Sequence, residues 1–208
     1  MLDLAPVYMQ PSRMEPQYAA MMIALYQDLG LDLSTLKGGL GLSPIGQKSL
    51  AGGGASDLPE RLLRTAEAAA FCAEQAPHIK VVNITAKAPH EGGGSEAHEL
   101  AFACGGGASY MRAFIDHGLT PDQAANALEF TFAADADVHL TIAKLRAERR
   151  VWAKVAAAFG CSPEARGMSL TAGTSNRMPT ARGDGPNPIR KACTGAGDHT
   201  EDARGRTR

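Results

Sequence analysis

The sequence has few aromatic residues and no excess of one charge. Phe, Trp and Tyr make up 5% of the chain, Trp occurs once, and the formal net charge is −1. Proteins that bind nucleic acid or an anionic membrane usually carry an excess of basic residues, which this chain does not have. We therefore expect neither nucleic acid nor a membrane as a partner. Its 208 residues, 44% of them hydrophobic, are typical of one globular domain with a sizeable core.

Cysteine is scarce, and long hydrophobic runs are missing. The four cysteines (Cys72, Cys104, Cys161 and Cys193) form no C-x-x-C pair and no regular framework, which predicts free thiols in a reducing cytosol. No apolar run is long enough to cross a bilayer, and the start at Met1 lacks the basic flank and hydrophobic segment of a signal peptide. We therefore expect a cytoplasmic protein.

Helix-like and strand-like segments alternate along the chain. Helices are predicted over 14–30, 57–75, 95–118, from Thr120 onward, and 142–159, and strands within 36–46 and over 79–85, 128–132 and 167–171. Asp57 to Glu60 and Thr120 to Gln123 are capping boxes that mark helix starts. The alternation predicts an α/β fold with a parallel sheet.

The predicted loop 89–94 carries His90. Two other features of this prediction leave alternatives open. The glycine run 105–107 lies within a predicted helix, which must pass or break there because each glycine costs about 1 kcal/mol relative to alanine. Met21, Met22, Leu25 and Leu29 form a stripe for which we favour core packing over an adaptable binding surface.

The number of strands predicts a partial barrel. We count about half of the eight strands that a closed (β/α)8 barrel requires, so residues 1–178 are expected to form a TIM-barrel-like part with open edges. Unpaired edges favour a partner, self-association or aggregation. From about Pro179 large apolar residues almost vanish, so 179–208 is predicted to be a disordered polar tail.

The segment 142–159 is predicted to be the best-defined helix. Its apolar residues recur at three-and-four spacing and indicate one buried face: Ile142, Leu145, Trp152, Val155, Ala156 and Phe159. Lys144 and Glu148 are interpreted as a surface pair. Arg146 and Arg150, at four-residue spacing with Lys154, fit a solvated face or, alternatively, a phosphate-binding site.

Several segments in a fixed order resemble the barrel domain of cobalamin-dependent methylmalonyl-CoA mutases. They are Ala88-Pro-His-Glu-Gly-Gly-Gly-Ser-Glu-Ala-His-Glu-Leu-Ala-Phe102, Tyr110-Met-Arg112, Gly118-Leu-Thr-Pro-Asp122, Asp135-Ala-Asp137 and Ile142 to Trp152. The segments 30–46 and Thr174-Ser-Asn-Arg-Met178 are similar to the small, non-catalytic subunit of the heterodimeric bacterial enzymes. The resemblance covers roughly residues 14–180.

The resemblance implies a radical isomerisation of an acyl-CoA that uses adenosylcobalamin. In active members a Tyr-His pair follows one strand, and its His donates to the thioester oxygen. His90 occupies that His position and is the candidate catalytic residue; the alternative, which we favour, is a loop histidine kept by descent without function. Arg146, Arg150, Thr174 and Ser175 are candidate substrate-binding residues.

The sequence departs from the active pattern at several positions. Pro89 stands where the Tyr is expected. The Arg-x-Ser-Phe that serves the anionic substrate reads Ala127-Leu-Glu-Phe130, which adds a carboxylate where an anionic ester would sit. His and Gln are missing from Thr171-Ala-Gly-Thr-Ser175. The string Asp137-Val-His-Leu-Thr-Ile142 lacks the glycine of the cobalamin-binding Asp-x-His-x-x-Gly motif.

Two hypotheses follow. The first is a shortened, non-catalytic, small-subunit-like barrel fragment that associates with a catalytic mutase subunit. The second is an enzyme that isomerises methylmalonyl-CoA to succinyl-CoA with adenosylcobalamin bound by a separate chain. The missing groups favour the first, because loss of one preorganised group commonly costs orders of magnitude in rate.

Overall fold

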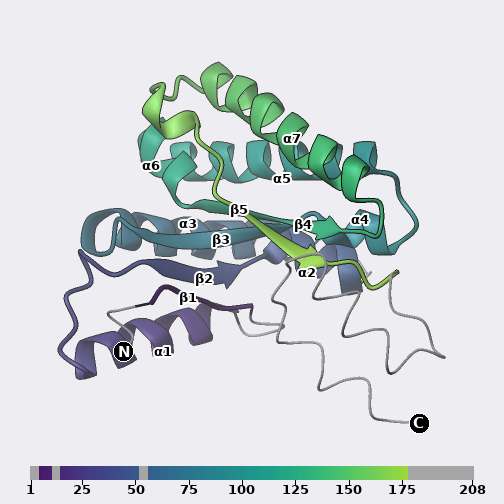
Figure 1. Ribbon diagram of the computed structural model, residues 1–208. Helices are drawn as coiled ribbons and strands as arrows, with labels where there is room; N and C mark the ends of the chain where they lie inside the picture. The colour runs from purple at the N-terminus through teal and green to yellow at the C-terminus, as the bar shows by residue number, and fades with distance from the viewer. Residues whose placement is uncertain (1–4, 11–14, 52–55, 178–208) are drawn as a thin grey trace, which may run out of the picture.

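The computed structural model describes residues 5–10, 15–51 and 56–177 (Figure 1). The strands are β1 (Val7–Tyr8), β2 (Gly38–Leu42), β3 (Ile79–Thr85), β4 (Leu128–Ala134) and β5 (Leu170–Thr174). The helices are α1 (Glu15–Asp28), α2 (Pro44–Ala51), α3 (Leu58–Gln75), α4 (Lys87–Glu91), α5 (Glu96–Asp116), α6 (Pro121–Asn126), α7 (Val138–Ala158) and the 3-10 turn η1 (Glu164–Arg166). The predicted tail lies outside the described residues.

The described strands form one five-stranded sheet in the order β1-β2-β3-β4-β5, with every neighbouring pair parallel. The longest ladders run along β4, where Leu128 to Thr131 pair with Val82 to Thr85, and Phe130 to Ala134 pair with Leu170 to Thr174. Helices connect the strands on the outer face (Figure 1). The predicted α/β fold, a partial barrel of parallel strands, is confirmed.

The sheet is strongly curled. A Cβ built on Gly39 of β2 would lie 3.1 Å from Oε2 of Glu129 on β4, although β3 separates these two strands. The same Cβ would lie 2.8 Å from the Tyr8 ring of β1. Side chains of non-adjacent strands therefore meet on the concave side, as they do inside a barrel.

Over β4, the convex side of the sheet is closed by α5 and α7. The rings of Phe130 on β4 and Trp152 on α7 pack with centroids 4.7 Å apart. Gly107 of α5 makes this possible, because a Cβ there would lie 3.0 Å from Cη2 of Trp152 and 3.3 Å from Phe130 Cζ. Helix α5 passes through the glycine run because tertiary packing outweighs the helix propensity lost at these positions.

Some element boundaries differ from the sequence predictions. The predicted loop at 89–94 begins as helix α4, the turn after β2 opens into α2, and the last strand is Leu170–Thr174 instead of 167–171. Asp57 precedes α3 but makes no side-chain cap bond; its carboxylate pairs with Lys48. The ion pair competes with the cap for the same carboxylate, so the capping box there was wrong.

Burial corrects three further interpretations. Ile142 is 48% exposed, whereas Lys144 and Glu148 are buried, so the surface-pair interpretation was wrong. Core packing was also wrong for Met21 and Leu25, which are exposed on α1, and for Leu29, which is exposed directly after it. Periodicity reports which residues share a face, but the neighbouring elements decide whether that face is covered. Among the residues that the structure describes, no helix has both the length and the apolar character that a membrane span needs.

Candidate functional site

A buried polar cluster lies at the carboxyl end of the sheet. His90 comes from α4 directly after β3, Ser175 directly follows β5, and Glu99 and Lys144 come from α5 and α7. These four side chains converge because the carboxyl ends of parallel strands share one edge and the next helices start there. All four residues are buried, with 0% to 3% exposure.

The Glu99 carboxylate is the centre of this cluster. Its Oε1 lies 2.7 Å from Lys144 Nζ and 2.9 Å from His90 Nδ1, and its Oε2 accepts the backbone N–H of Ala133 at 3.1 Å. A fully buried carboxylate is stable only when it is paired and hydrogen-bonded, and three donors meet that requirement here. Glu99 thereby links α4, α5, α7 and β4.

Both ring nitrogens of His90 are engaged by protein groups. A carboxylate can only accept, so a neutral ring that hydrogen-bonds to Glu99 carries its proton on Nδ1; Arg177 Nη1 also lies 3.5 Å from this nitrogen. Nε2 then accepts from the Ser175 hydroxyl, whose Oγ lies 2.7 Å away. Asp135 Oδ2 is also near Nε2, at 3.6 Å.

The segment after β5 covers this histidine. The backbone N–H of Arg177 donates to Ser175 Oγ at 3.1 Å, and its guanidinium donates to the Gly94 carbonyl at 3.2 Å. In the same segment, the backbone N–H of Asn176 donates to Glu91 Oε1 at 2.9 Å. The His90 ring is thus enclosed between α4 and the end of β5, and its exposed fraction is 0%.

The order Ser175, His90, Glu99 matches the hydroxyl, imidazole and carboxylate order of acyl-transfer triads. Such a nucleophile must be reachable by a substrate carbonyl. Ser175 is 0% exposed, and its oxygen already accepts the Arg177 N–H. The arrangement therefore works as a closed hydrogen-bond chain and not as a nucleophilic site.

A second buried polar contact lies beside the first. Cys104 Sγ donates to Glu148 Oε1 at 3.5 Å, and Glu148 Oε2 has no hydrogen-bond partner within the described residues. Burial raises the pKa of Glu148 to about 7, the Cys104 hydrogen bond lowers it, and the Glu99 charge raises it. Burial also raises the pKa of Cys104 to about 12, so this thiol is not a reactive thiolate at neutral pH.

The carboxylate of Glu129 occupies the concave side of the sheet. It is 2% exposed, and Oε1 accepts from Thr171 Oγ1 at 2.6 Å. Burial raises the pKa of Glu129, while the Thr171 hydrogen bond and the Lys80 charge lower it. The acidic group that the sequence places in the family's Arg-x-Ser-Phe segment is therefore an inward-facing side chain bonded to β5.

The structure unites some of the candidate residues and separates others. His90 and Ser175 are in contact, and Thr174 is buried directly before Ser175. Arg146 and Arg150 lie on the exposed face of α7, opposite its buried residues. The structure does not bring these arginines to the buried cluster, and substrate binding by the four residues stays a prediction.

Sequence reasoning missed Glu99 and Lys144 as members of the site. The sequence assigned Glu99 no role in a site, and it predicted Lys144 to form a surface pair with Glu148. A signal was present, because Lys144, Glu148, Trp152 and Ala156 recur every four residues on one line of α7, and all four are buried. Lys144 and Glu148 lie on the same line of α7 as Trp152, the single tryptophan of the chain. Their position on the side of the helix that buries this tryptophan indicates that both polar side chains are buried.

The described residues do not fit a cobalamin-ligating site. The nearest string places His139 in the first turn of α7, where it is exposed. The preceding Asp137 caps this helix, its carboxylate accepting the Leu140 N–H at 2.9 Å. The string is a helix start, so we assign the cofactor to none of the residues that the structure describes.

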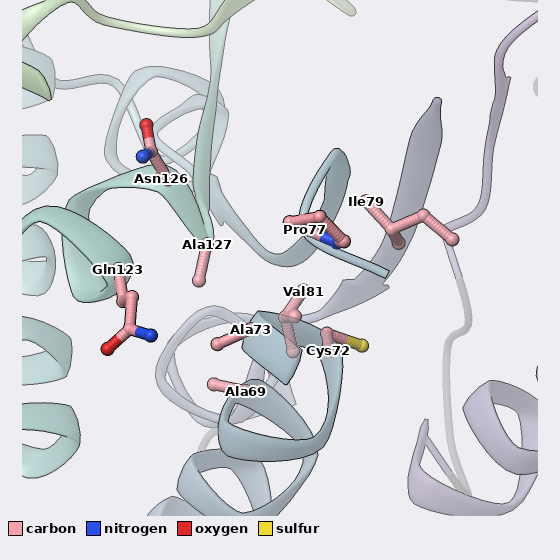
Figure 2. Close-up of a pocket in the computed structure, with 9 residues that line it drawn as sticks. All are labelled: Ala69, Cys72, Ala73, Pro77, Ile79, Val81, Gln123, Asn126 and Ala127. Carbon is pink, nitrogen blue, oxygen red and sulfur yellow. The ribbon is translucent and has the colours of Figure 1, made fainter. Parts of the chain in front are cut away.

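A small cavity lies near the amino ends of β3 and β4, away from His90 (Figure 2). It measures about 60 Å³ and is lined by Ala69, Cys72, Ala73, Pro77, Ile79, Val81, Gln123, Asn126 and Ala127. Ligand pockets usually measure roughly 300–1,000 Å³. Burial raises the pKa of Cys72 to about 11, so this cavity is a packing gap beside an inert thiol.

The amino-acid sequence of this chain is similar to those of known proteins from one family. The methylmalonyl-CoA mutase family model matches residues 1–197. The small subunit from Streptomyces virginiae is 38% identical over 204 residues, covering 97% of this chain and 32% of the relative. The small subunit from Propionibacterium freudenreichii subsp. shermanii is 32% identical over 76% of this chain and 24% of its own length.

A large subunit is also similar to this chain. The one from Porphyromonas gingivalis is 29% identical over 59% of this chain and 17% of its own length. The chain spans about a third or less of the length of these curated relatives. The family model's match to nearly the whole chain and the 38% identity to a small subunit show that this chain belongs to the methylmalonyl-CoA mutase family.

Proposed function

We propose that this chain is a small-subunit-like mutase fragment that catalyses no reaction by itself and acts by associating with a catalytic mutase subunit. The observation that carries the proposal is the enclosure of His90. Both of its ring nitrogens are engaged, by Glu99 and Ser175, and the ring is 0% exposed. A histidine in this state has no free donor for a thioester oxygen.

The surroundings of His90 support the same proposal. Pro89 precedes it, so the expected phenol is missing from this position. On the concave side, Glu129 presents a carboxyl group bonded to Thr171. Burying a second anion beside it would be costly, which disfavours an acyl-CoA at this position.

Association is supported by the family and by the open sheet. Relatives of this chain are named small subunits, which implies a larger counterpart. The described sheet ends at β1 and β5, each with only one neighbouring strand. Edge strands present unpaired backbone groups and favour pairing with another chain.

The test combines association with turnover. The purified chain is mixed with adenosylcobalamin and methylmalonyl-CoA, with and without a separate cobalamin-binding chain, and succinyl-CoA is measured. In parallel, the tagged chain is used to capture the methylmalonyl-CoA mutase large subunit of Porphyromonas gingivalis. We expect capture without turnover. Succinyl-CoA formation above the no-protein control would contradict the non-catalytic role.

The alternative function is acyl-CoA isomerisation with cobalamin held by a separate chain. It is favoured by the resemblance to active members, which implies that His90 stands at the family's histidine position. His90 would be the catalytic residue, and Arg146, Arg150, Thr174 and Ser175 would contact the substrate. Turnover that disappears in His90→Ala and persists in His139→Ala, an exposed histidine, would establish it.

A further inference from the structure

The enclosure of His90 has two halves that are held in different ways. The inner half is built from buried charges, because Glu99 holds Nδ1 of the ring and Lys144 holds Glu99, with side chains at most 1% exposed. Breaking this half would leave a charge unpaired in the interior, which is costly. The outer half is the turn that follows β5, drawn as the short yellow-green segment after the β5 arrow in Figure 1. We call this turn, residues 175–177, the latch.

Hydrogen bonds attach the latch to the rest of the protein. The backbone N–H of Ser175 donates to the Ala134 carbonyl at 2.9 Å, and its hydroxyl oxygen lies 2.7 Å from His90 Nε2. The backbone N–H of Asn176 donates to Glu91 Oε1 at 2.9 Å. All three latch residues are polar, so hydrogen bonds and not the burial of apolar side chains keep the latch closed.

Arg177 is the outermost contact of the latch. Its Nη1 donates to the carbonyls of Gly94 and His90 at 3.2 Å and 3.4 Å, and it lies 3.5 Å from His90 Nδ1. The residue is exposed, so water replaces these hydrogen bonds when the latch opens. The net contribution of such a hydrogen bond to stability is therefore small.

This difference between the two halves determines how His90 becomes reachable. Segments that bury few apolar contacts and rely on exposed hydrogen bonds open locally, at a lower free energy than global unfolding. The latch has these properties, whereas the pair of Glu99 and Lys144 does not. When the latch alone opens, Glu99 still orients Nδ1 of the ring, while Nε2 loses the Ser175 hydroxyl and meets solvent.

We propose that the latch is an autoinhibitory strap that closes over His90 and opens by itself, without unfolding of the sheet, so that Nε2 of an oriented imidazole becomes reachable by an acyl compound. The inference concerns the enclosed histidine on which the proposed function rests. It adds that the enclosure is reversible and that residues 175–177 control it.

The first test measures access to Nε2 with diethyl pyrocarbonate, which acylates the unprotonated nitrogen of an imidazole. The wild-type chain is treated at one neutral pH, and mass spectrometry of peptides follows the rate at His90, with the exposed His139 as internal reference. Urea is then added below the unfolding transition. Local opening exposes little surface, so the relative rate at His90 should change less than about twofold. A steep rise with urea, or no reaction before global unfolding, would overturn the latch.

The second test releases the latch from both sides. Arg177→Ala removes the bonds to the Gly94 and His90 carbonyls, and Glu91→Ala removes the acceptor of the Asn176 N–H. The rate at His90 should rise about tenfold in Arg177→Ala and about threefold in Glu91→Ala. Arg149→Ala on α7 and Glu74→Ala on α3 each remove one exposed charge of the same sign, and these controls should leave the rate unchanged.

Urea unfolding of each variant separates local opening from a loss of global stability. A faster reaction at His90 with an unchanged urea midpoint supports the latch. An unchanged rate in both variants, or a rate that rises only as far as the midpoint falls, means that the whole fold encloses the ring, and the latch is wrong. The readout uses neither turnover nor capture of a large subunit, so this inference can fail while the proposed association stands, and the reverse.

Discussion

Glu99 and Lys144 form an ion pair inside the protein, with Lys144 Nζ 2.7 Å from Glu99 Oε1 and both side chains at most 1% exposed. The pair joins α5 to α7, and the same carboxylate oxygen lies 2.9 Å from His90 Nδ1. The position of the histidine therefore depends on a contact between two helices that adjoin it only in the folded chain.

Replacing Lys144 with Met should destabilise the protein by about 3–5 kcal/mol, because a buried carboxylate loses its cation. Urea unfolding measures the change. Lys154→Met on the exposed face of the same helix is the matched control, and its effect should stay within about 0.5 kcal/mol. Equal effects of the two substitutions would show that the ion pair carries no special stability.

Glu148 should make stability fall as pH rises through the neutral range. Its folded pKa of about 7 exceeds the ordinary 4.5, so between these values the unfolded chain releases a proton that the folded chain keeps. The resulting decrease in the free energy of unfolding approaches about 3 kcal/mol at the alkaline end of this range. The groups facing it are Cys104 and Glu99 on α5, with Lys144 one turn away on α7.

Unfolding free energies measured from pH 4 to pH 8 test this dependence. Glu148→Gln keeps the shape of the side chain and removes its titration, so the decline with pH should flatten. Glu164→Gln is the control, since this exposed residue lies in η1. A wild-type profile that rises over this range would contradict the buried, raised-pKa carboxyl group.

The neutral His90 ring should carry its proton on Nδ1. Long-range nitrogen-15 correlation spectra distinguish the two tautomers. Glu99→Gln should disturb this assignment, since an amide can donate as well as accept. Ser175→Ala should keep Nδ1 protonated and shift the Nε2 resonance, because the hydroxyl donor is gone. A wild-type ring protonated on Nε2 would overturn the proposed Ser175–His90–Glu99 chain.

Gly107→Ala should destabilise the protein although alanine favours helices. The new methyl group would press on the Trp152 ring and Phe130, and overpacking commonly costs about 1–3 kcal/mol. Gly105 is the matched control in the same helix, since a Cβ there meets nothing within 4 Å. Gly105→Ala should stabilise by up to about 1 kcal/mol. Similar effects at both positions would refute this packing account.

The amino-acid sequence by itself determined the alternation of helices and strands, the parallel sheet and the resemblance to the mutase family. It also singled out His90. Local rules suffice for these features: the strand 79–85 is β-branched, and Thr120 caps α6 with Gln123 as predicted. Such signals act within a few residues and need no knowledge of distant neighbours.

Only the tertiary structure decided which polar residues are inside and which apolar residues are outside. Lys144 is buried because Glu99, 45 positions earlier, offers it a carboxylate, and no local pattern contains that pairing. Leu25 is exposed because nothing among the described residues covers that flank of α1. Burial is a property of two surfaces in contact, so the spacing of residues on one helix can propose a face but cannot supply what packs against it.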